Sequence, residues 1–132
     1  MDYIAREGEL GNWDVALLEL GANALGWEVD KIRERVTNVL LQIAGRNPDK
    51  KIFVISPFYT QVDYLGDSNG DKWRREIEHI ISQTNYPNVT YINGTDILGE
   101  MSLLCADEIH PNIYGVAQIA ERLTKRIQEV LR

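Results

Sequence analysis

The sequence has a single cysteine, Cys105, so no disulfide can form within the chain. Its neighbours Leu104 and Ala106 are apolar, and we expect a buried, unreactive thiol. No apolar run approaches the ~20 residues that a membrane-spanning helix needs, and the first residues lack the apolar region of a signal peptide. These absences predict a cytoplasmic protein that does not contact a membrane.

Basic residues are also scarce. The chain has 14 Lys and Arg against 20 Asp and Glu, a formal net charge of -6 and a pI of about 4.9. A nucleic-acid-binding surface needs a basic stripe, which the scattered Lys and Arg residues do not form. With only two histidines and no cluster of metal-ligating residues, the sequence predicts neither a nucleic-acid partner nor a metal or other cofactor.

Length and hydrophobic pattern predict one domain, residues 1–132, around one core. Residues 13–20 and 51–56 are continuous apolar runs rich in branched side chains, and 88–92 is a weaker run. Continuous rather than alternating apolarity indicates strands that are covered on both faces, as in parallel sheets. Apolar residues recur at helical spacing in three segments, 29–43, 73–81 and 116–130. The order of these elements predicts a three-layer α/β/α fold with a parallel sheet.

Residues 107–112 (Asp-Glu-Ile-His-Pro-Asn) have the arrangement of a catalytic site. Asp107 lies three residues before His110, so both side chains can lie on the same side of one turn. The carboxylate can then accept the imidazole Nδ1 proton and fix the tautomer of the ring. Pro111 disfavours helical geometry at His110, which predicts an exposed ring in an extended loop. A chance pair with Asn112 as a helix cap explains the same residues, and the spacing does not decide between the two.

Polar residues follow the predicted strands at their carboxyl ends, where ligands collect in parallel sheets. Residues 21–23 (Gly-Ala-Asn) follow the first strand, and residues 56–59 (Ser-Pro-Phe-Tyr) follow the second. The Asn23 amide can donate to the oxyanion of a tetrahedral intermediate, a contact worth about 3 to 4 kcal/mol. An ordinary Gly-Asn turn explains the same residues, and spacing alone favours the turn.

Residues 66–70 (Gly-Asp-Ser-Asn-Gly) precede the helical segment around Trp73. A serine at a helix N-terminus lies among backbone N–H groups that can stabilise an oxyanion. However, residues 59–65 are too polar for a central buried strand, and the Gly-Asp-Ser-Asn residues are common turn formers. The sequence therefore favours a turn with a helix cap over Ser68 as a nucleophile.

Residues 21–23, residues 55–58, and residues 107–112 with Gly115 resemble, in order and spacing, the central and last motifs of the SGNH hydrolases, the GDSL-like lipase/acylhydrolase superfamily. The resemblance covers the chain from about residue 13 onward. It implies a flavodoxin-like fold and a serine esterase that needs no cofactor and acts on a small-molecule ester.

The same resemblance assigns roles to individual residues. His110 would be the general base, Asp107 its orienting partner, and Asn23 an oxyanion-hole donor. The family commonly has Gly-x-Asn-Asp in its middle motif, whereas this sequence has Ala24 in place of the Asp. By the resemblance, this departure weakens a supporting hydrogen bond and leaves Asn23 in place.

The larger departure is at the front of the chain. Family members begin with a strand that runs into Gly-Asp-Ser, which carries the nucleophile, followed by a second strand. Here the pattern of residues 1–10 indicates the end of a helix. We therefore expect a partial domain that lacks the first two strands and the nucleophile.

Three interpretations follow from this departure. The favoured one is the C-terminal part of a serine esterase for carboxylic esters, by family analogy those of acylated carbohydrates. The chain on its own would then be inactive. The others are a catalytically inactive binding module of the same fold and a complete hydrolase that uses Ser68.

A missing strand also bears on assembly. The strand at residues 13–20 has a neighbour on each side in the family's sheet. Without one of them, residues 15–18 would present unpaired backbone groups on an apolar edge, and such edges recruit other strands. We therefore expect a homodimer, or association with the missing N-terminal segment.

Overall fold

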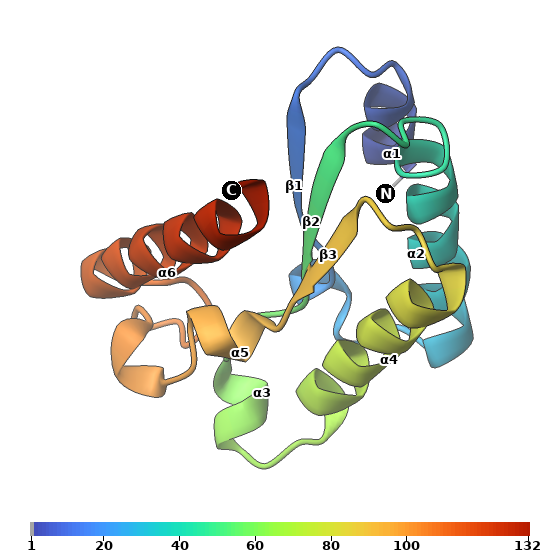
Figure 1. Ribbon diagram of the computed structural model, residues 1–132. Helices are drawn as coiled ribbons and strands as arrows, with labels where there is room; N and C mark the ends of the chain where they lie inside the picture. Colours follow the sequence, from blue (N-terminus) through green and yellow to red (C-terminus); the bar gives the residue numbers. More distant parts are fainter. Residues whose placement is uncertain (1) are drawn as a thin grey trace.

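A three-stranded parallel sheet lies between two layers of helices in the computed structural model, which describes residues 2–132 (Figure 1). The strands are β1 (Val15–Glu19), β2 (Lys51–Ile55) and β3 (Val89–Ile92), hydrogen-bonded in the order β1-β2-β3. Each of the three runs predicted as strands contains one of them. The predicted three-layer α/β/α arrangement is thereby confirmed.

Helices precede the first strand, connect the strands and follow the last one. The long helices are α1 (Asp2–Glu9), α2 (Val29–Ile43), α4 (Asn69–Thr84) and α6 (Ile113–Leu131). The short ones are α3 (Gln61–Tyr64), α5 (Gly94–Ile97) and the 3₁₀ turns η1 (Ala22–Ala24) and η2 (Met101–Leu103). Figure 1 shows α1, α2 and α4 on one face of the sheet and α6 on the other. Among the described residues, no helix combines the length and apolarity needed to cross a membrane.

The central strand β2 packs against both helical layers. Ile52 and Val54 belong to the larger core, with apolar side chains of α2 and α4. Phe53 and Ile55 belong to a second cluster with Leu123 of α6. Burying a side chain of this size stabilises the fold by about 1.5–3 kcal/mol relative to its exposure. The expectation of a strand covered on both faces is confirmed for β2.

Strand β1 departs from that expectation. It pairs with β2 along one side, and within residues 2–132 no strand pairs with its other side. Val15 and Leu17 are 41% and 48% exposed, whereas Ala16 and Leu18 are half-buried. Continuous apolarity shows what a strand can bury, but the burial itself depends on neighbouring elements. The apolar open edge expected from the resemblance is present in the described chain.

Candidate active site

Asp107 and His110 are in direct contact in the loop between η2 and α6. The His110 Nδ1 atom lies 2.8 Å from Asp107 Oδ2. The other carboxylate oxygen accepts the backbone N–H groups of Ile109 at 3.0 Å and His110 at 2.9 Å. One carboxylate therefore holds both the backbone and the ring of His110, and the predicted hydrogen bond is present.

The charge of this carboxylate fixes the state of the imidazole. The pKa of Asp107 is lowered from 3.8 to about 2, first by the backbone N–H of His110, then by that of Ile109 and by the His110 ring. An ionised carboxylate only accepts hydrogen bonds, so Nδ1 carries the proton in the neutral ring. The side chain of His110 is 75% exposed, and Nε2 has no hydrogen-bond partner within residues 2–132. This is the state of a ring that can take a proton from another group.

The side chain of Asn112 connects the His110 loop to the start of α6 by hydrogen bonds. Its Oδ1 accepts the backbone N–H groups of Tyr114 and Gly115, each at 3.0 Å. Its Nδ2 donates to the carbonyl oxygens of Ser102 at 2.9 Å and Leu104 at 3.0 Å. The helix-cap reading of Asn112 is therefore correct, and it is compatible with the Asp107–His110 contact.

The close packing around position 115 explains why the motif ends in a glycine there. A Cβ atom at this position would overlap the carbonyl oxygen of Leu103 and press on the Cβ of Pro111. The first turn of α6 thus lies directly against η2 and the loop that carries His110. A larger residue at position 115 would displace that loop.

Glu108 ties the His110 loop to the segment after β2. Its φ is 60°, in the left-handed region that a non-glycine residue rarely adopts. Its carbonyl oxygen accepts the backbone N–H of Gln61 at 2.9 Å, at the start of α3. The sequence does not predict this contact, because neither residue carries a local signal for it.

Asn23 lies at the carboxyl end of β1, where the sequence placed it. Gly21 makes the turn possible: its φ is +117°, and a Cβ there would lie 2.9 Å from both Pro57 and Trp73. Asn23 follows in η1, exposed, beside a cavity of about 250 Å³ that Leu20 and Trp27 also line. His110 does not line this cavity, and no hydrogen bond joins it to Asn23 in the described chain. The role of Asn23 as an oxyanion-hole donor remains a prediction.

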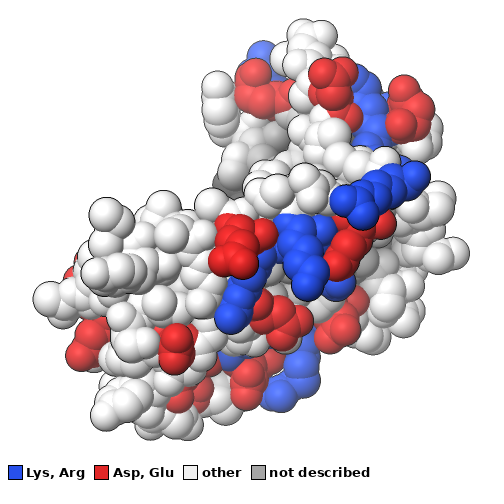
Figure 2. All heavy atoms as spheres, turned by 60° about the vertical axis from the view of Figure 1, so that its left-hand side comes forward, with Lys and Arg blue, Asp and Glu red and all other residues white. Residues whose placement is uncertain are grey.

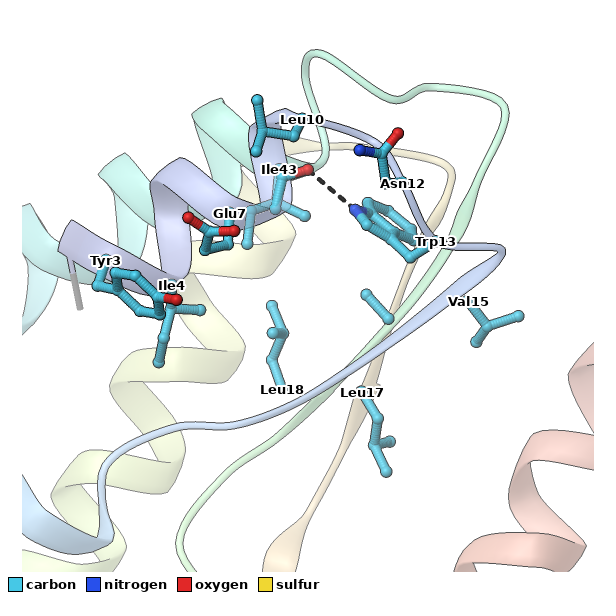
Figure 3. A pocket seen from close by; sticks show the side chains of 12 residues that line it. Tyr3, Ile4, Glu7, Leu10, Asn12, Trp13, Val15, Leu17, Leu18 and Ile43 are labelled. Carbon is cyan, nitrogen blue, oxygen red and sulfur yellow. Dashed lines mark hydrogen bonds between the residues drawn. The ribbon is translucent and has the colours of Figure 1, made fainter.

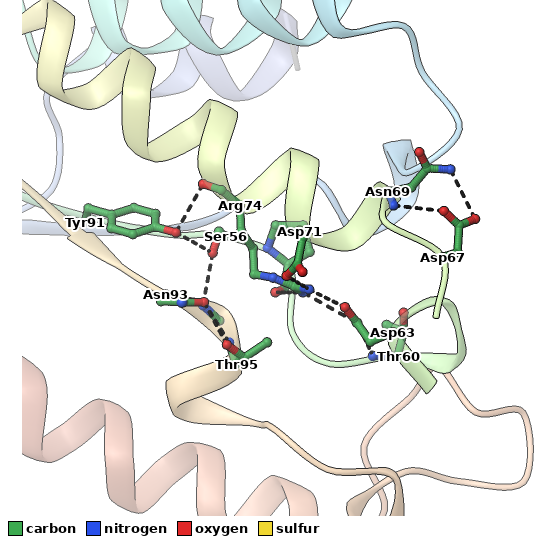
Figure 4. A network of polar contacts seen from close by, with 12 residues as sticks. Ser56, Thr60, Asp63, Asp67, Asn69, Asp71, Arg74, Tyr91, Asn93 and Thr95 are labelled. Atoms are coloured by element: carbon green, nitrogen blue, oxygen red, sulfur yellow. Dashed lines mark hydrogen bonds and ion pairs between the residues drawn. The ribbon is translucent and has the colours of Figure 1, made fainter. Parts of the chain in front are cut away.

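Ser56 joins the carboxyl ends of β2 and β3 (Figure 4). Its buried Oγ accepts the backbone N–H of Gly94 and the hydroxyl of Tyr91, each at 3.0 Å. Burial raises the pKa of the Tyr91 hydroxyl above its ordinary value of 10.0. The sequence predicts Ser56 at the end of its strand but carries no signal for its hydrogen bonds to Gly94 and Tyr91.

Arg74 fixes the segment after β2 to α4. Its buried guanidinium donates to the Pro57 carbonyl oxygen at 3.3 Å, to Asp71 at 2.9 Å and to Asp63 of α3 (Figure 4). Burial alone would lower the pKa of Arg74, but the hydrogen bonds to the two carboxylates outweigh it and raise the pKa. The group supports α3, against which the His110 loop is hydrogen-bonded.

Ser68 lies in the turn before α4, as the interpretation of residues 66–70 as a turn predicts. The Asp67 carboxylate accepts the backbone N–H and the side-chain amide of Asn69, whereas Ser68 makes no side-chain capping bond. Ser68 lines a cavity with Arg74 that does not include His110. No hydrogen bond joins Ser68 to His110 within residues 2–132.

The expectation of a buried Cys105 is wrong, because the thiol is exposed. Leu104 pairs with Pro111 in an isolated β-bridge and is buried, and the alternation of an extended segment turns the next side chain outward. The Cys105 Sγ lies 3.5 Å from the Pro111 carbonyl oxygen. In the part of the chain that the structure describes, no three His, Cys, Asp or Glu side chains are grouped to hold a metal ion.

No protein-family model matches the sequence. No curated protein matches it either. Solved structures do match. A salicylyl-acyltransferase from a tetracycline biosynthetic pathway has a TM-score of 0.82 at 19% identity, over 98% of this chain and 41% of that one. A carbohydrate esterase of family 3 from Talaromyces cellulolyticus has a TM-score of 0.76 at 20% identity, over 96% of this chain and 63% of that one.

A third match is a protein described as a GDSL-like lipase, from Bacteroides ovatus. Its TM-score is 0.76 at 18% identity, over 96% of this chain and 40% of that one. The present chain thus spans less than two thirds of the length of each of these proteins. Residues 2–132 have the fold of the SGNH, GDSL-like esterases and acyltransferases.

Proposed function

We propose that this chain carries the general base, the orienting carboxylate and an oxyanion donor of a serine-type site that hydrolyses carboxylic esters. The observation that carries the proposal is the His110 ring, held through Nδ1 by the ionised Asp107 with Nε2 open to solvent. The fold supports the same reaction class, because the solved structures that share it include an esterase and an acyltransferase.

In this reaction, His110 Nε2 takes the proton of a serine hydroxyl as its oxygen attacks the ester carbonyl carbon. The negative charge moves to the carbonyl oxygen, where the Asn23 amide N–H donates to it. His110 then gives the proton to the leaving alkoxide, and water, activated by the same ring, releases the acid and regenerates the serine. Asp107 remains ionised throughout and stabilises the imidazolium.

The serine of this mechanism comes from a segment outside the 132 residues. Ser68 makes no contact with His110 and sits in a turn on another cavity. Strand β1 has an open edge in the described chain, where a further strand would extend the sheet. The chain would then be inactive when it is alone.

For the substrate, we propose esters of acylated carbohydrates. The carbohydrate esterase that shares the fold supports this class. The exposure of the His110 side chain supports it as well, since a ring that is 75% exposed leaves room for a bulky alcohol such as a sugar.

The proposal is tested by adding an apolar strand that ends in Gly-Asp-Ser upstream of residue 1 and measuring hydrolysis of p-nitrophenyl acetate. We expect turnover that falls by about 10³-fold or more in His110→Ala and when the added serine is replaced by alanine. Ser68→Ala is the matched control and should leave the rate unchanged. A folded extended chain without turnover would contradict the proposal and favour an inactive binding module.

A further inference from the structure

The exposed large apolar side chains of the described chain gather at a few places. Figure 2 shows one face of the molecule, on which charged side chains form a band with uncharged surface beside it. One apolar group lines a cavity of about 450 Å³ between β1 and α1 (Figure 3). None of the described residues that line this cavity belongs to the His110 loop. A second group belongs to that loop and the first turn of α6, and consists of Ile109, Ile113 and Tyr114, which are 53%, 79% and 74% exposed.

The backbone of all three residues is fixed close to His110. Ile109 precedes it in the chain, and the Ile109 N–H donates to the same carboxylate that holds the ring. Ile113 and Tyr114 are the first two residues of α6, and the Tyr114 N–H donates to Asn112 Oδ1 at 3.0 Å. Each Cα–Cβ bond of a helix is tilted toward its amino end. The side chains of Ile113 and Tyr114 therefore lean toward the loop that carries His110.

The chemistry of the proposed site decides which half of an ester meets this surface. His110 gives its proton to the leaving alkoxide, so the leaving oxygen must come within about 3 Å of Nε2. The carbonyl oxygen, in contrast, faces the Asn23 amide. The alcohol half of the ester therefore extends from Nε2 over the surface around the His110 ring.

The surface around His110 suits a neutral alcohol. No Lys or Arg occurs within residues 76–121, so neither the loop nor the first turn of α6 offers a cation to a phosphate or a carboxylate. Asp107 and Glu108 of the same loop are acidic and repel an anion. A neutral sugar ring has an apolar face of C–H groups and hydroxyl groups around its rim. Tyr114 matches this division, because it has an apolar ring with a hydroxyl at one end.

We infer that Ile109, Ile113 and Tyr114 form the binding surface for the alcohol half of the substrate, a neutral sugar that stacks on the Tyr114 ring. The inference rests on the proposed function for the half of the ester that lies here. The class of alcohol rests on the exposed apolar side chains and on the charges of the surrounding sequence. Covering these side chains with the C–H face of a sugar removes apolar surface from water, which favours binding. The three residues thus determine specificity, and the proton transfer is left to His110.

The test is a titration of the 132-residue chain with xylotriose, followed by NMR through the methyl signals of Ile109 and Ile113 and the ring signals of Tyr114. We expect saturable shifts of these signals. Tyr114→Ala should weaken binding by about fivefold or more, because it removes the ring on which the sugar stacks, whereas Tyr114→Phe should retain binding. Tyr3→Ala removes an equally exposed tyrosine on α1 and is the matched control, with no effect expected. Circular dichroism checks that the variants fold.

Two further probes test the class of alcohol. Glycerol 3-phosphate is an anionic alcohol and should not shift the signals of the three residues. Hexan-1-ol is apolar throughout and should bind more weakly than xylotriose, because it cannot use the Tyr114 ring and its hydroxyl together. Tighter binding of either probe than of xylotriose would overturn the assignment to a neutral sugar. Absence of saturable shifts with xylotriose, or binding that a folded Tyr114→Ala variant retains in full, would overturn the binding surface itself.

The sugar surface and the proposed function fail separately. His110→Ala should bind xylotriose as tightly as the wild-type chain, because the imidazole is needed for proton transfer and not for stacking. Xylotriose binding that depends on Tyr114, with no ester hydrolysis by the chain extended with Gly-Asp-Ser, would remove the function and leave the sugar surface. Hydrolysis of acetylated xylotriose by the extended chain, with the same KM in its Tyr114→Ala variant, would remove the sugar surface and leave the function.

Discussion

The backbone N–H of Gln61 donates to the carbonyl oxygen of Glu108 over 2.9 Å. This bond joins the segment after β2 to the loop that carries His110. The segment after β2 is held in turn by Arg74, whose buried guanidinium contacts Pro57 and Asp63. The position of His110 at the sheet edge therefore depends on residues that do not touch it.

Replacing Asp63 by asparagine should lower the free energy of unfolding by about 3 kcal/mol, because it leaves the buried Arg74 charge without its main partner. The side chains of Arg74 and Asp63 are 6% and 10% exposed. Asp71 contacts the same guanidinium from the surface, so Asp71→Asn is the matched control and should cost less than about 1 kcal/mol. Urea unfolding measures both, and equal costs would show that burial of the pair does not matter.

Asn112→Ala should destabilise the chain by about 2 kcal/mol, since it removes a helix cap and two bonds to loop carbonyl groups. Asn38→Ala removes a single side-chain bond, to Gln42, and should stay within about 0.5 kcal/mol of the wild-type value. Thermal unfolding followed by circular dichroism compares them. Similar shifts for the two variants would argue against Asn112 as the anchor of the His110 loop.

The Asp107 carboxyl should titrate with a midpoint of about 2. Its pKa is lowered in the folded state, so its contribution to stability is present above its ordinary value of 3.8 and is lost as the pH falls through about 2. The carboxyl carbon chemical shift of Asp107, followed by NMR, gives the midpoint, and Asp107→Asn identifies the resonance. A midpoint near 3.8 would mean that the bonds from the Ile109 and His110 N–H groups do not persist in solution.

The 132-residue chain alone should hydrolyse p-nitrophenyl acetate no more than about twofold faster than its His110→Ala variant. The reason is that no hydroxyl nucleophile contacts His110 in the described chain. Steady-state rates at equal protein concentration test this. Clear turnover that Ser68→Ala abolishes would instead make Ser68 the nucleophile.

The elements that build the fold could be predicted because each has a strong local signal. The apolar runs that contain β1, β2 and β3 and the helical spacing in α2, α4 and α6 are properties of short segments. The Asp107–His110 contact was also predictable, because both residues lie in one turn.

Other features depend on contacts between distant segments and leave no local trace. The pairing of Arg74 with Asp63 and the bond from Gln61 to Glu108 are of this kind. Cys105 was predicted to be buried because its neighbours are apolar, but Leu104 takes the inward position and Cys105 points outward. Exposure of β1 likewise depends on which strands are present and not on its own sequence.

The most direct test of His110 as a general base held by Asp107 is a measurement of the tautomer of its ring. The two ring ¹⁵N chemical shifts give the tautomer, measured in the 132-residue chain with the ring neutral. We expect a proton on Nδ1 and an unprotonated Nε2, because the ionised Asp107 accepts from Nδ1 at 2.8 Å. Asp107→Ala should shift the equilibrium toward the Nε2 proton. A wild-type ring that carries its proton on Nε2, or one that Asp107→Ala leaves unchanged, would contradict the assignment of His110 as a general base held by Asp107.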